Sequence, residues 1–113
     1  MKVLVDANIL MMGIDLSEYR GKIAIPLPCL KELEMLSEFC GKRGRAARVA
    51  LMLVENLGIE VVEAEGDCDP SLADIAIKMK WAVATNDRKL IKALSDNRIE
   101  VLRPVHGRLE RGD

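Results

Sequence analysis

The sequence predicts an α/β domain with a largely parallel sheet of about five strands and helices on both faces. Two observations lead to this fold class. Short apolar runs, each long enough for one buried strand, alternate with longer segments in which apolar residues recur every three or four positions. Runs without polar alternation are typical of strands that helices cover on both faces. Alternating strands and helices form parallel sheets with right-handed connections.

The first half of the chain supplies two strands and the connection between them. Val3-Leu4-Val5 is apolar on both faces and is predicted to be a strand. The apolar residues 9–12 are predicted to form a short helix or loop that Gly13 ends. Residues 22–26 form the second predicted strand, because β-branched residues alternate there and prolines follow.

Two helices are predicted next. The first spans about residues 28–40, and the second spans about residues 45–57 and stops at Gly58. Apolar residues at helical spacing mark the predicted core face of each. These residues are Leu30, Leu33, Leu36 and Cys40 in the first helix, and Ala46, Val49, Ala50, Leu53 and Leu57 in the second.

The second half of the chain repeats the alternation. Strands are predicted at residues 59–62, 82–85 and 99–102, and a helix at residues 88–94. Between the first two of these strands, Asp69 is predicted to be the N-cap of a helix that begins with Pro70 and runs to about Lys80. Its core face would contain Leu72, Ile75, Ala76 and Met79.

The composition fits one globular domain. A chain of 113 residues, half of them hydrophobic, is long enough to bury a single core. We expect residues 1–103 to form the domain and residues 104–113 to form a polar, partly mobile C-terminal tail. No stretch is long and apolar enough to cross a membrane, and the N-terminus lacks the features of a signal peptide. A cytoplasmic location is therefore expected.

The cysteines support the same expectation. Cys29, Cys40 and Cys68 are odd in number and form no close pair in the sequence. This usage predicts reduced thiols in a cytosolic protein.

Four acidic residues are predicted to meet at one edge of the sheet. Asp6 and Asp87 each follow an apolar strand, whereas Asp69 opens a helix and Glu32 lies in the first turn of another. Strand carboxyl ends and helix starts share the edge at which α/β sheets bind ligands. Ordinary structural roles are the alternatives: a helix cap for Asp69 or Asp87, and a carboxylate that reaches water from the flank of its helix for Glu32.

Clustered carboxylates favour a hard divalent cation such as Mg²⁺ or Mn²⁺ over zinc. His106, the one histidine, lies in the predicted tail, so a histidine-based nucleophile site is not expected, and no glycine-rich phosphate loop is present. A metal held by carboxylates can generate hydroxide and neutralise charge at phosphorus, as in phosphodiester hydrolysis.

The distribution of positive charge indicates a polyanionic partner. The formal net charge is −1, but four acids gathered at a metal would leave 17 basic against 14 acidic residues, a balance of +3. Lys42, Arg43, Arg45 and Arg48 lie together where the second long helix begins, with no acid among them. Cations at a helix N-terminus oppose its dipole, a cost that polyanion binding would explain. A solvated face is the alternative.

Three motifs resemble the PIN-domain ribonucleases, and the resemblance covers nearly the whole chain. They are Val-Leu-Val-Asp6-Ala-Asn8, Pro28-Cys-Leu-Lys-Glu32-Leu, and Val-Ala-Thr85-Asn86-Asp87-Arg-Lys-Leu. The resemblance implies a single PIN-like domain in which Asp6, Glu32, a third acid and Asp87 hold Mg²⁺ or Mn²⁺, with Asn8, Thr85 and Asn86 as polar supports. The third acid is Asp69, which lies 18 residues before Asp87. Asp74 is the alternative, although its spacing from Lys78 is that of a surface ion pair.

The resemblance also implies an activity. It predicts a divalent-metal-dependent endoribonuclease in which an activated water attacks the scissile phosphate in line and leaves a 5′-phosphate. Basic residues would hold the RNA backbone: Lys42, Arg43, Arg45, Arg48, Arg88 and Lys89. The chain is similar to archaeal PIN proteins related to the nuclease that cuts ribosomal RNA precursors.

Two other functions remain open. One is a toxin nuclease of a toxin–antitoxin pair, which predicts an antitoxin partner. The other is a PIN-like module that binds RNA or a ribosome-assembly partner without cleaving RNA. A homodimer is a further expectation from the family resemblance.

Overall fold

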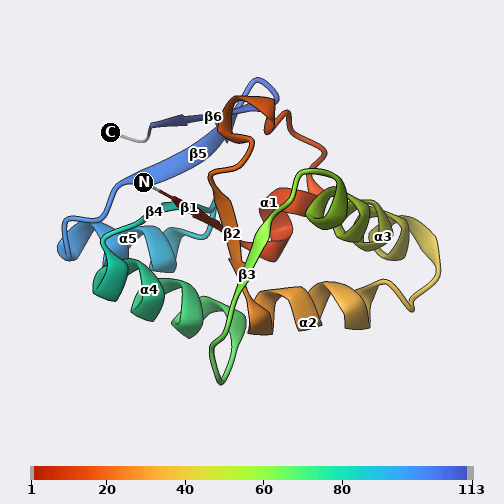
Figure 1. Ribbon diagram of the computed structural model, residues 1–113, viewed down its shortest axis with the longest axis horizontal. Coiled ribbons are helices and arrows are strands. Elements are labelled where there is room, and N and C mark those ends of the chain that lie inside the picture. The colour runs from red at the N-terminus through yellow and green to blue at the C-terminus, as the bar shows by residue number, and fades with distance from the viewer. Residues whose placement is uncertain (1, 112–113) are drawn as a thin grey trace.

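A computed structural model describes residues 2–111 and contains one six-stranded sheet (Figure 1). The strand order is β3-β2-β1-β4-β5-β6, and the first five strands are parallel. Their bounds are Val3–Val5 (β1), Ile23–Pro26 (β2), Glu60–Val62 (β3), Ala82–Ala84 (β4), Val101–Val105 (β5) and Arg108–Arg111 (β6). The predicted fold class is confirmed, with one strand more than expected.

Strand β1 lies at the centre of the sheet, where the chain changes direction. Strands β2 and β3 add to one side of β1, and β4 and β5 add to the other. The register pairs Val5 at the end of β1 with Ala84 at the end of β4. The residues that follow these two strands therefore emerge side by side, at the topological switch point where α/β sheets bind ligands.

Helices cover both faces of the sheet, as predicted. Their bounds are Ala7–Met11 (α1), Leu27–Leu36 (α2), Gly41–Asn56 (α3), Cys68–Met79 (α4) and Arg88–Asp96 (α5), with a short 3₁₀ helix at Ser17–Tyr19. Helices α1, α2 and α3 pack together, while α4 packs on α5 and on β1, β2 and β4. Figure 1 shows α1 and α3 to the right of the strands and α4 and α5 to the left.

Most of the predicted C-terminal tail is a β-hairpin. Residues 101–105 and 108–111 form β5 and β6, which pair antiparallel. His106 and Gly107 have φ values of 50° and 76°, as the two central residues of a tight hairpin turn require. Leu109 is buried opposite Pro104. The sequence did not predict this strand, because one apolar residue among charged ones gives no alternating pattern. The last two residues of the predicted tail, 112–113, lie outside the described part of the chain.

Helix α3 begins four residues earlier than predicted, so the basic residues 42–45 lie in its first turns and not in a loop. Its buried face contains Gly44, Ala47 and Ala50, and Val49, predicted to be core, is 51% exposed. The face that contains Gly44 packs against the preceding turn so closely that a side chain at Gly44 would collide with the Phe39 carbonyl.

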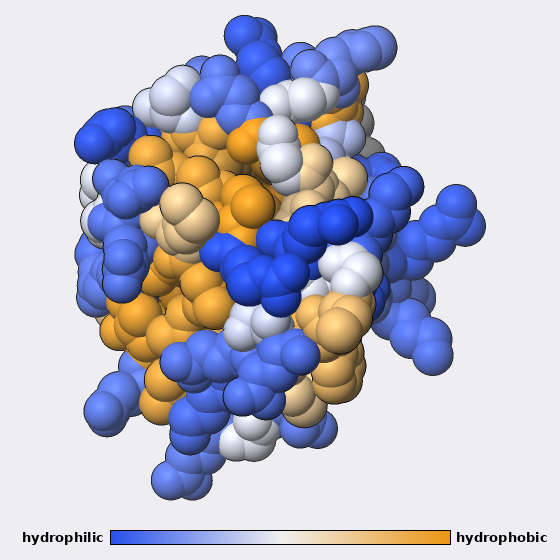
Figure 2. Space-filling model, turned by 90° about the vertical axis from the view of Figure 1, so that its right-hand side faces the viewer, coloured by the Kyte–Doolittle hydropathy of each residue, from blue (hydrophilic) through white to orange (hydrophobic). Residues whose placement is uncertain are grey.

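Several large apolar side chains are exposed on α2, on α3 and in the turn between them. Met35, Phe39, Val49 and Met52 are each more than half exposed. Figure 2 looks onto the side where α2 meets α3 and shows apolar side chains beside a cluster of hydrophilic ones. Exposed apolar surface of this kind is common at interaction sites.

The prediction of three reduced thiols is wrong. Cys29 and Cys68 form a disulfide across a sequence separation of 39 residues, while Cys40 is exposed and free. The bond joins α2 to α4. The sequence could not reveal it because the two cysteines become neighbours only when β2 and β3 place the following helices side by side. A cross-link over this separation is worth about 3 to 4 kcal/mol in the loop-closure account.

The described helices include none that combines the length and the apolar character needed to cross a membrane.

Candidate active site

An open cavity of about 610 Å³ lies beyond the carboxyl ends of β1 and β4. Its walls come from the residues that follow these strands, one side of α2, the loop that leads into α4 and the first turn of α4. All four predicted acids line it: Asp6, Glu32, Asp69 and Asp87. Elements that are far apart in the sequence thus bring four carboxylates to one space.

Asp6 is the most buried of these acids, with 5% of its surface exposed. It follows β1 directly and caps α1, because its Oδ1 accepts a hydrogen bond from the backbone N–H of Asn8 at 3.2 Å. Its Oδ2 accepts a hydrogen bond from the Thr85 hydroxyl at 3.1 Å. Burial raises the pKa of Asp6, and the charge of Asp87 raises it further, whereas the two hydrogen bonds lower it.

The hydroxyl of Thr85 connects the two strand ends. Thr85 is fully buried directly after β4. It donates to Asp6 and, through the same oxygen, accepts a hydrogen bond from the Asp87 backbone N–H at 3.2 Å. The Thr-Asn-Asp motif therefore positions one acid and the backbone of another with a single side chain.

Asp87 caps α5, the alternative role that the sequence left open. Its Oδ1 accepts a hydrogen bond from the backbone N–H of Leu90 at 2.9 Å. Asp87 also lines the cavity and lies close enough to Asp6 and Asp69 to raise the pKa of both. Capping and a place in the site are therefore compatible for this residue.

Asp69 is not a helix cap, and the predicted helix start is wrong by two residues. Helix α4 begins at Cys68, with Asp67 at the N-cap position and Asp69 inside the first turn. Burial raises the pKa of Asp69, followed by the charges of Asp6 and Asp87. Its carboxylate is free of the capping role and faces the other acids.

Glu32 lies in the second turn of α2, on the side that faces the cavity. Burial raises its pKa, and the charges of Asp6 and Asp69 add to this effect, whereas Arg43 lowers it. Asp74, the alternative third acid, is exposed on α4 and does not line the cavity.

The polar residues predicted to support the site differ in position. Asn8 lines the cavity and is bound to Asp6 through its backbone, whereas Asn86 is exposed and does not line it. The structure adds Lys31, Asp67 and Cys68 to the walls. Their one sequence signal is that each lies within two residues of a predicted acid.

The predicted RNA-binding residues also divide into groups. Lys42, Arg43 and Asn8 line a hollow next to the acidic cavity, and Asn8 also lines the cavity itself. Arg48 donates hydrogen bonds to the carbonyls of Ser37 and Phe39 and so holds the turn between α2 and α3. All six are exposed, and the remaining three line neither the hollow nor the cavity: Arg45, Arg88 and Lys89.

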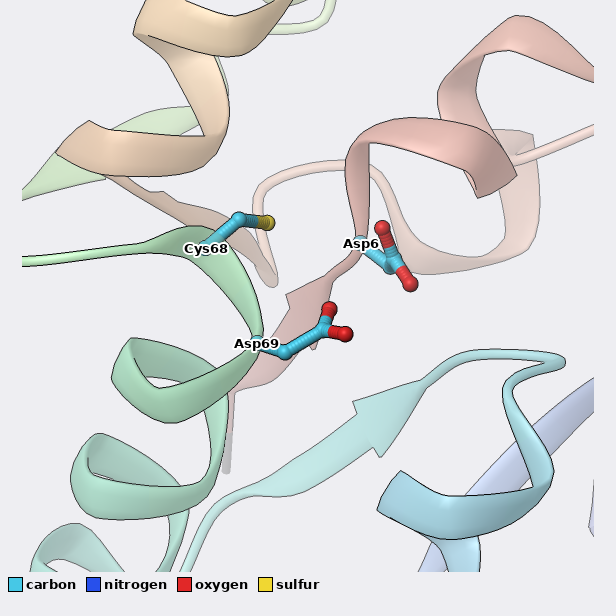
Figure 3. A group of neighbouring side chains, drawn as sticks. All are labelled: Asp6, Cys68 and Asp69. Carbon is cyan, nitrogen blue, oxygen red and sulfur yellow. The ribbon is translucent and has the colours of Figure 1, made fainter.

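The donor set fits a hard divalent cation. Carboxylate oxygens are the ligands that Mg²⁺ and Mn²⁺ prefer. Three of the four acids have raised pKa values with other acids among the causes, and a cation between them would relieve this repulsion. A carboxylate oxygen of Asp6, one of Asp69 and the Cys68 sulfur, which is part of the disulfide, lie within 4.8 Å of one another. Figure 3 shows Cys68 and Asp69 both directed toward Asp6.

Comparison with known proteins now decides the family. The family model described as "PIN like domain" matches residues 3–106. The chain belongs to the PIN-like domain family. The chain is 42% identical over 72 residues to ribonuclease VapC9 of Archaeoglobus fulgidus. That match covers 64% of the chain and about half the length of the relative.

Two solved structures are similar over nearly all of this PIN-like chain. The PIN domain endonuclease Utp24 is 25% identical with a TM-score of 0.74, over 98% of this chain and 92% of the other. A domain of a protein of unknown function from Methanocaldococcus jannaschii is 20% identical with a TM-score of 0.66, over 92% and 91% of the two chains. The second likeness supports the fold alone.

The raised pKa of Asp69 predicts how stability depends on pH. A carboxyl whose pKa is higher in the folded state disfavours folding when it is ionised, so this cost is present at neutral pH and disappears as pH falls through the raised pKa toward about 4. In chelator, Asp69→Asn should therefore increase the free energy of unfolding near neutral pH, and this gain should shrink as the solution is acidified. Urea unfolding across this pH range measures it. A variant less stable than the parent at neutral pH would contradict the prediction.

Proposed function

We propose that this chain is a divalent-metal-dependent endoribonuclease that hydrolyses RNA phosphodiester bonds. The observation that carries the proposal is the meeting of four acids, from four separate segments, around one open cavity. The names of the relatives, a ribonuclease and an endonuclease, support the same activity.

In this proposal Asp6, Glu32, Asp69 and Asp87 hold Mg²⁺ or Mn²⁺, directly or through water. A cation bound there supplies an activated water and neutralises charge on the phosphate. Other residues of the chain orient the acids. The hydrogen bond from Thr85 orients Asp6 and opposes the rise of its pKa, and the Asn8 N–H fixes the other oxygen of the same carboxylate. The capping bond to Leu90 holds Asp87 at the cavity wall.

RNA is the substrate class that the surroundings favour. Lys42 and Arg43 line the hollow that adjoins the acidic cavity at Asn8. From there they can bind phosphates next to the one that is cleaved. Lys31 lines the cavity itself, and the exposed Arg88 and Lys89 follow Asp87 directly in the chain. Three aromatic residues in the whole chain leave little scope for recognition by base stacking.

A ribosomal RNA precursor is the substrate we favour within this class. The sequence resemblance supports it, and the likeness to the PIN domain endonuclease Utp24, which covers nearly the whole of both chains, supports endonucleolytic cleavage. The second candidate is a toxin nuclease, and the likeness to ribonuclease VapC9 supports RNA cleavage in either case. Growth arrest on expression, relieved by a cognate binding partner, would support the toxin. The expected homodimer, and a ribosome-assembly or antitoxin partner, stay predictions.

The first test replaces a metal ligand and a matched acid. Asp6→Asn removes a charge at the centre of the site and should reduce RNA cleavage in Mg²⁺ by at least about 100-fold. Asp74→Asn, the same change on the exposed face of α4, should leave cleavage unchanged. Circular dichroism would verify folding of both variants. Full cleavage by Asp6→Asn in Mg²⁺ or Mn²⁺, or a comparable loss in Asp74→Asn, would refute the assignment.

The second test concerns the RNA backbone. Arg43→Gln removes one phosphate contact and should weaken binding to RNAs of different sequence by similar factors. The slope of log affinity against log salt concentration should fall by about 0.7 to 1. Fluorescence anisotropy on the Asp6→Asn background prevents cleavage during the measurement. Lys78→Gln, at the far end of α4, is the control; equal slopes for both variants would argue against a role for Arg43.

A further inference from the structure

The Cys29–Cys68 disulfide lies at the wall of the acidic cavity. Cys68 is the first residue of α4, directly before Asp69, and it lines the cavity, whereas Cys29 is fully buried on α2 and does not. The bond therefore presents one sulfur to the space that the acids share. In Figure 3 the Cys68 side chain points toward Asp6.

We infer that reduction of this disulfide turns the cavity into a mixed thiolate–carboxylate site for a soft or borderline divalent cation, with Cys68, Asp6 and Asp69 as ligands. The site is additional to the hard-cation site proposed above and shares two acids with it. A metal of the Zn²⁺ or Cd²⁺ class is the ligand, because thiolates select such metals over Mg²⁺ and Mn²⁺.

The distances support this site. One oxygen of each carboxylate and the Cys68 sulfur lie within 4.8 Å of one another. Zinc bonds of about 2.3 Å to sulfur and about 2.1 Å to oxygen place two tetrahedral ligands roughly 3.6 Å apart. Small rotations of the Asp69 and Cys68 side chains would close this gap. Three protein ligands with one open position are a common zinc arrangement.

The oxidised form offers no such ligand. A sulfur in a disulfide carries no thiolate charge, so only carboxylate oxygens remain for a cation in the cavity, and these favour Mg²⁺ or Mn²⁺. The redox state of one bond therefore decides which class of metal the cavity binds.

The chemistry balances with a dithiol as the reductant. A thiolate of the dithiol attacks the Cys68 sulfur from the cavity, and the bond to the Cys29 sulfur breaks, releasing the Cys29 thiol. The second sulfur of the dithiol then displaces Cys68, and the reductant leaves as a cyclic disulfide. When the metal binds, the Cys68 sulfur–metal bond forms and the thiol proton passes to solvent.

The test uses Cd²⁺, whose bonds to thiolates absorb in the ultraviolet. Cys40→Ser serves as the background throughout, because Cys40 is exposed and would bind Cd²⁺ itself. The protein is reduced with dithiothreitol and freed of it under nitrogen. We expect the reduced protein to bind one Cd²⁺ per chain with a new absorption band, which Zn²⁺ removes by competition. The oxidised protein should show no band.

Two cysteine variants separate the roles of the sulfurs. Adding Cys29→Ser breaks the disulfide but leaves the cavity thiol, so the band should form without reductant. Adding Cys68→Ser leaves only the buried Cys29 and should abolish it. Each variant lacks the disulfide, so any loss of stability is matched between them, and circular dichroism verifies folding.

One carboxylate variant tests the oxygen ligands. In the reduced protein, Asp69→Asn should weaken Cd²⁺ binding at least tenfold. A band that persists after Cys68→Ser, equal affinity after Asp69→Asn, or no band in the reduced protein would overturn the inference. None of these readouts uses RNA cleavage. RNA cleavage in Mg²⁺ without the Cd²⁺ band would refute the thiolate site and leave the proposed nuclease activity intact. The Cd²⁺ band without RNA cleavage would refute the proposed nuclease activity and leave the thiolate site intact.

Discussion

The repulsion between carboxylates at the switch point of the sheet is the constraint on which the rest of the structure depends. Burial and neighbouring charges raise the pKa values of Asp6, Glu32 and Asp69, so a metal-free protein holds these groups together at an energetic cost. The packed sheet and helices supply the stability that opposes this cost. Sites that lower stability while concentrating charge are typical of function, because binding of a counter-ion recovers the energy.

The fold imposes this arrangement through a few contacts. The register of β1 against β4 sets Asp6 level with Thr85, and the Thr85 hydroxyl holds Asp6 and the backbone of Asp87 together. The disulfide fixes the start of α4, and with it Asp69, against the helix that carries Glu32. The cations of α3 lie next to this cluster and not within it. The proposed function uses this separation, with neighbouring phosphates on the cations and the reactive phosphate at the acids.

Sequence reasoning predicted the strands and the convergence of acids, because apolar runs and the polar residues after them are local signals. It failed where long-range packing decides. Asp69 was predicted to cap α4, but the helix begins two residues earlier, which local capping preferences cannot reveal. The Cys29–Cys68 bond could not be predicted because the two cysteines meet only in the folded protein. Strand β6 could not be predicted because its one buried apolar residue, Leu109, gives no strand pattern. The roles of the site residues in metal binding and catalysis stay predictions.

A crystal structure of the oxidised protein with Mn²⁺, located by its anomalous scattering, tests the central claim most directly. The account predicts Mn²⁺ in the cavity, bound by the Asp6 and Asp69 carboxylates, with Glu32 and Asp87 bound directly or through water. Repeating the measurement on Asp69→Asn should weaken or remove the peak, while Asp74→Asn should leave it unchanged. An empty cavity at millimolar Mn²⁺, or a peak at Asp74 instead, would contradict the account.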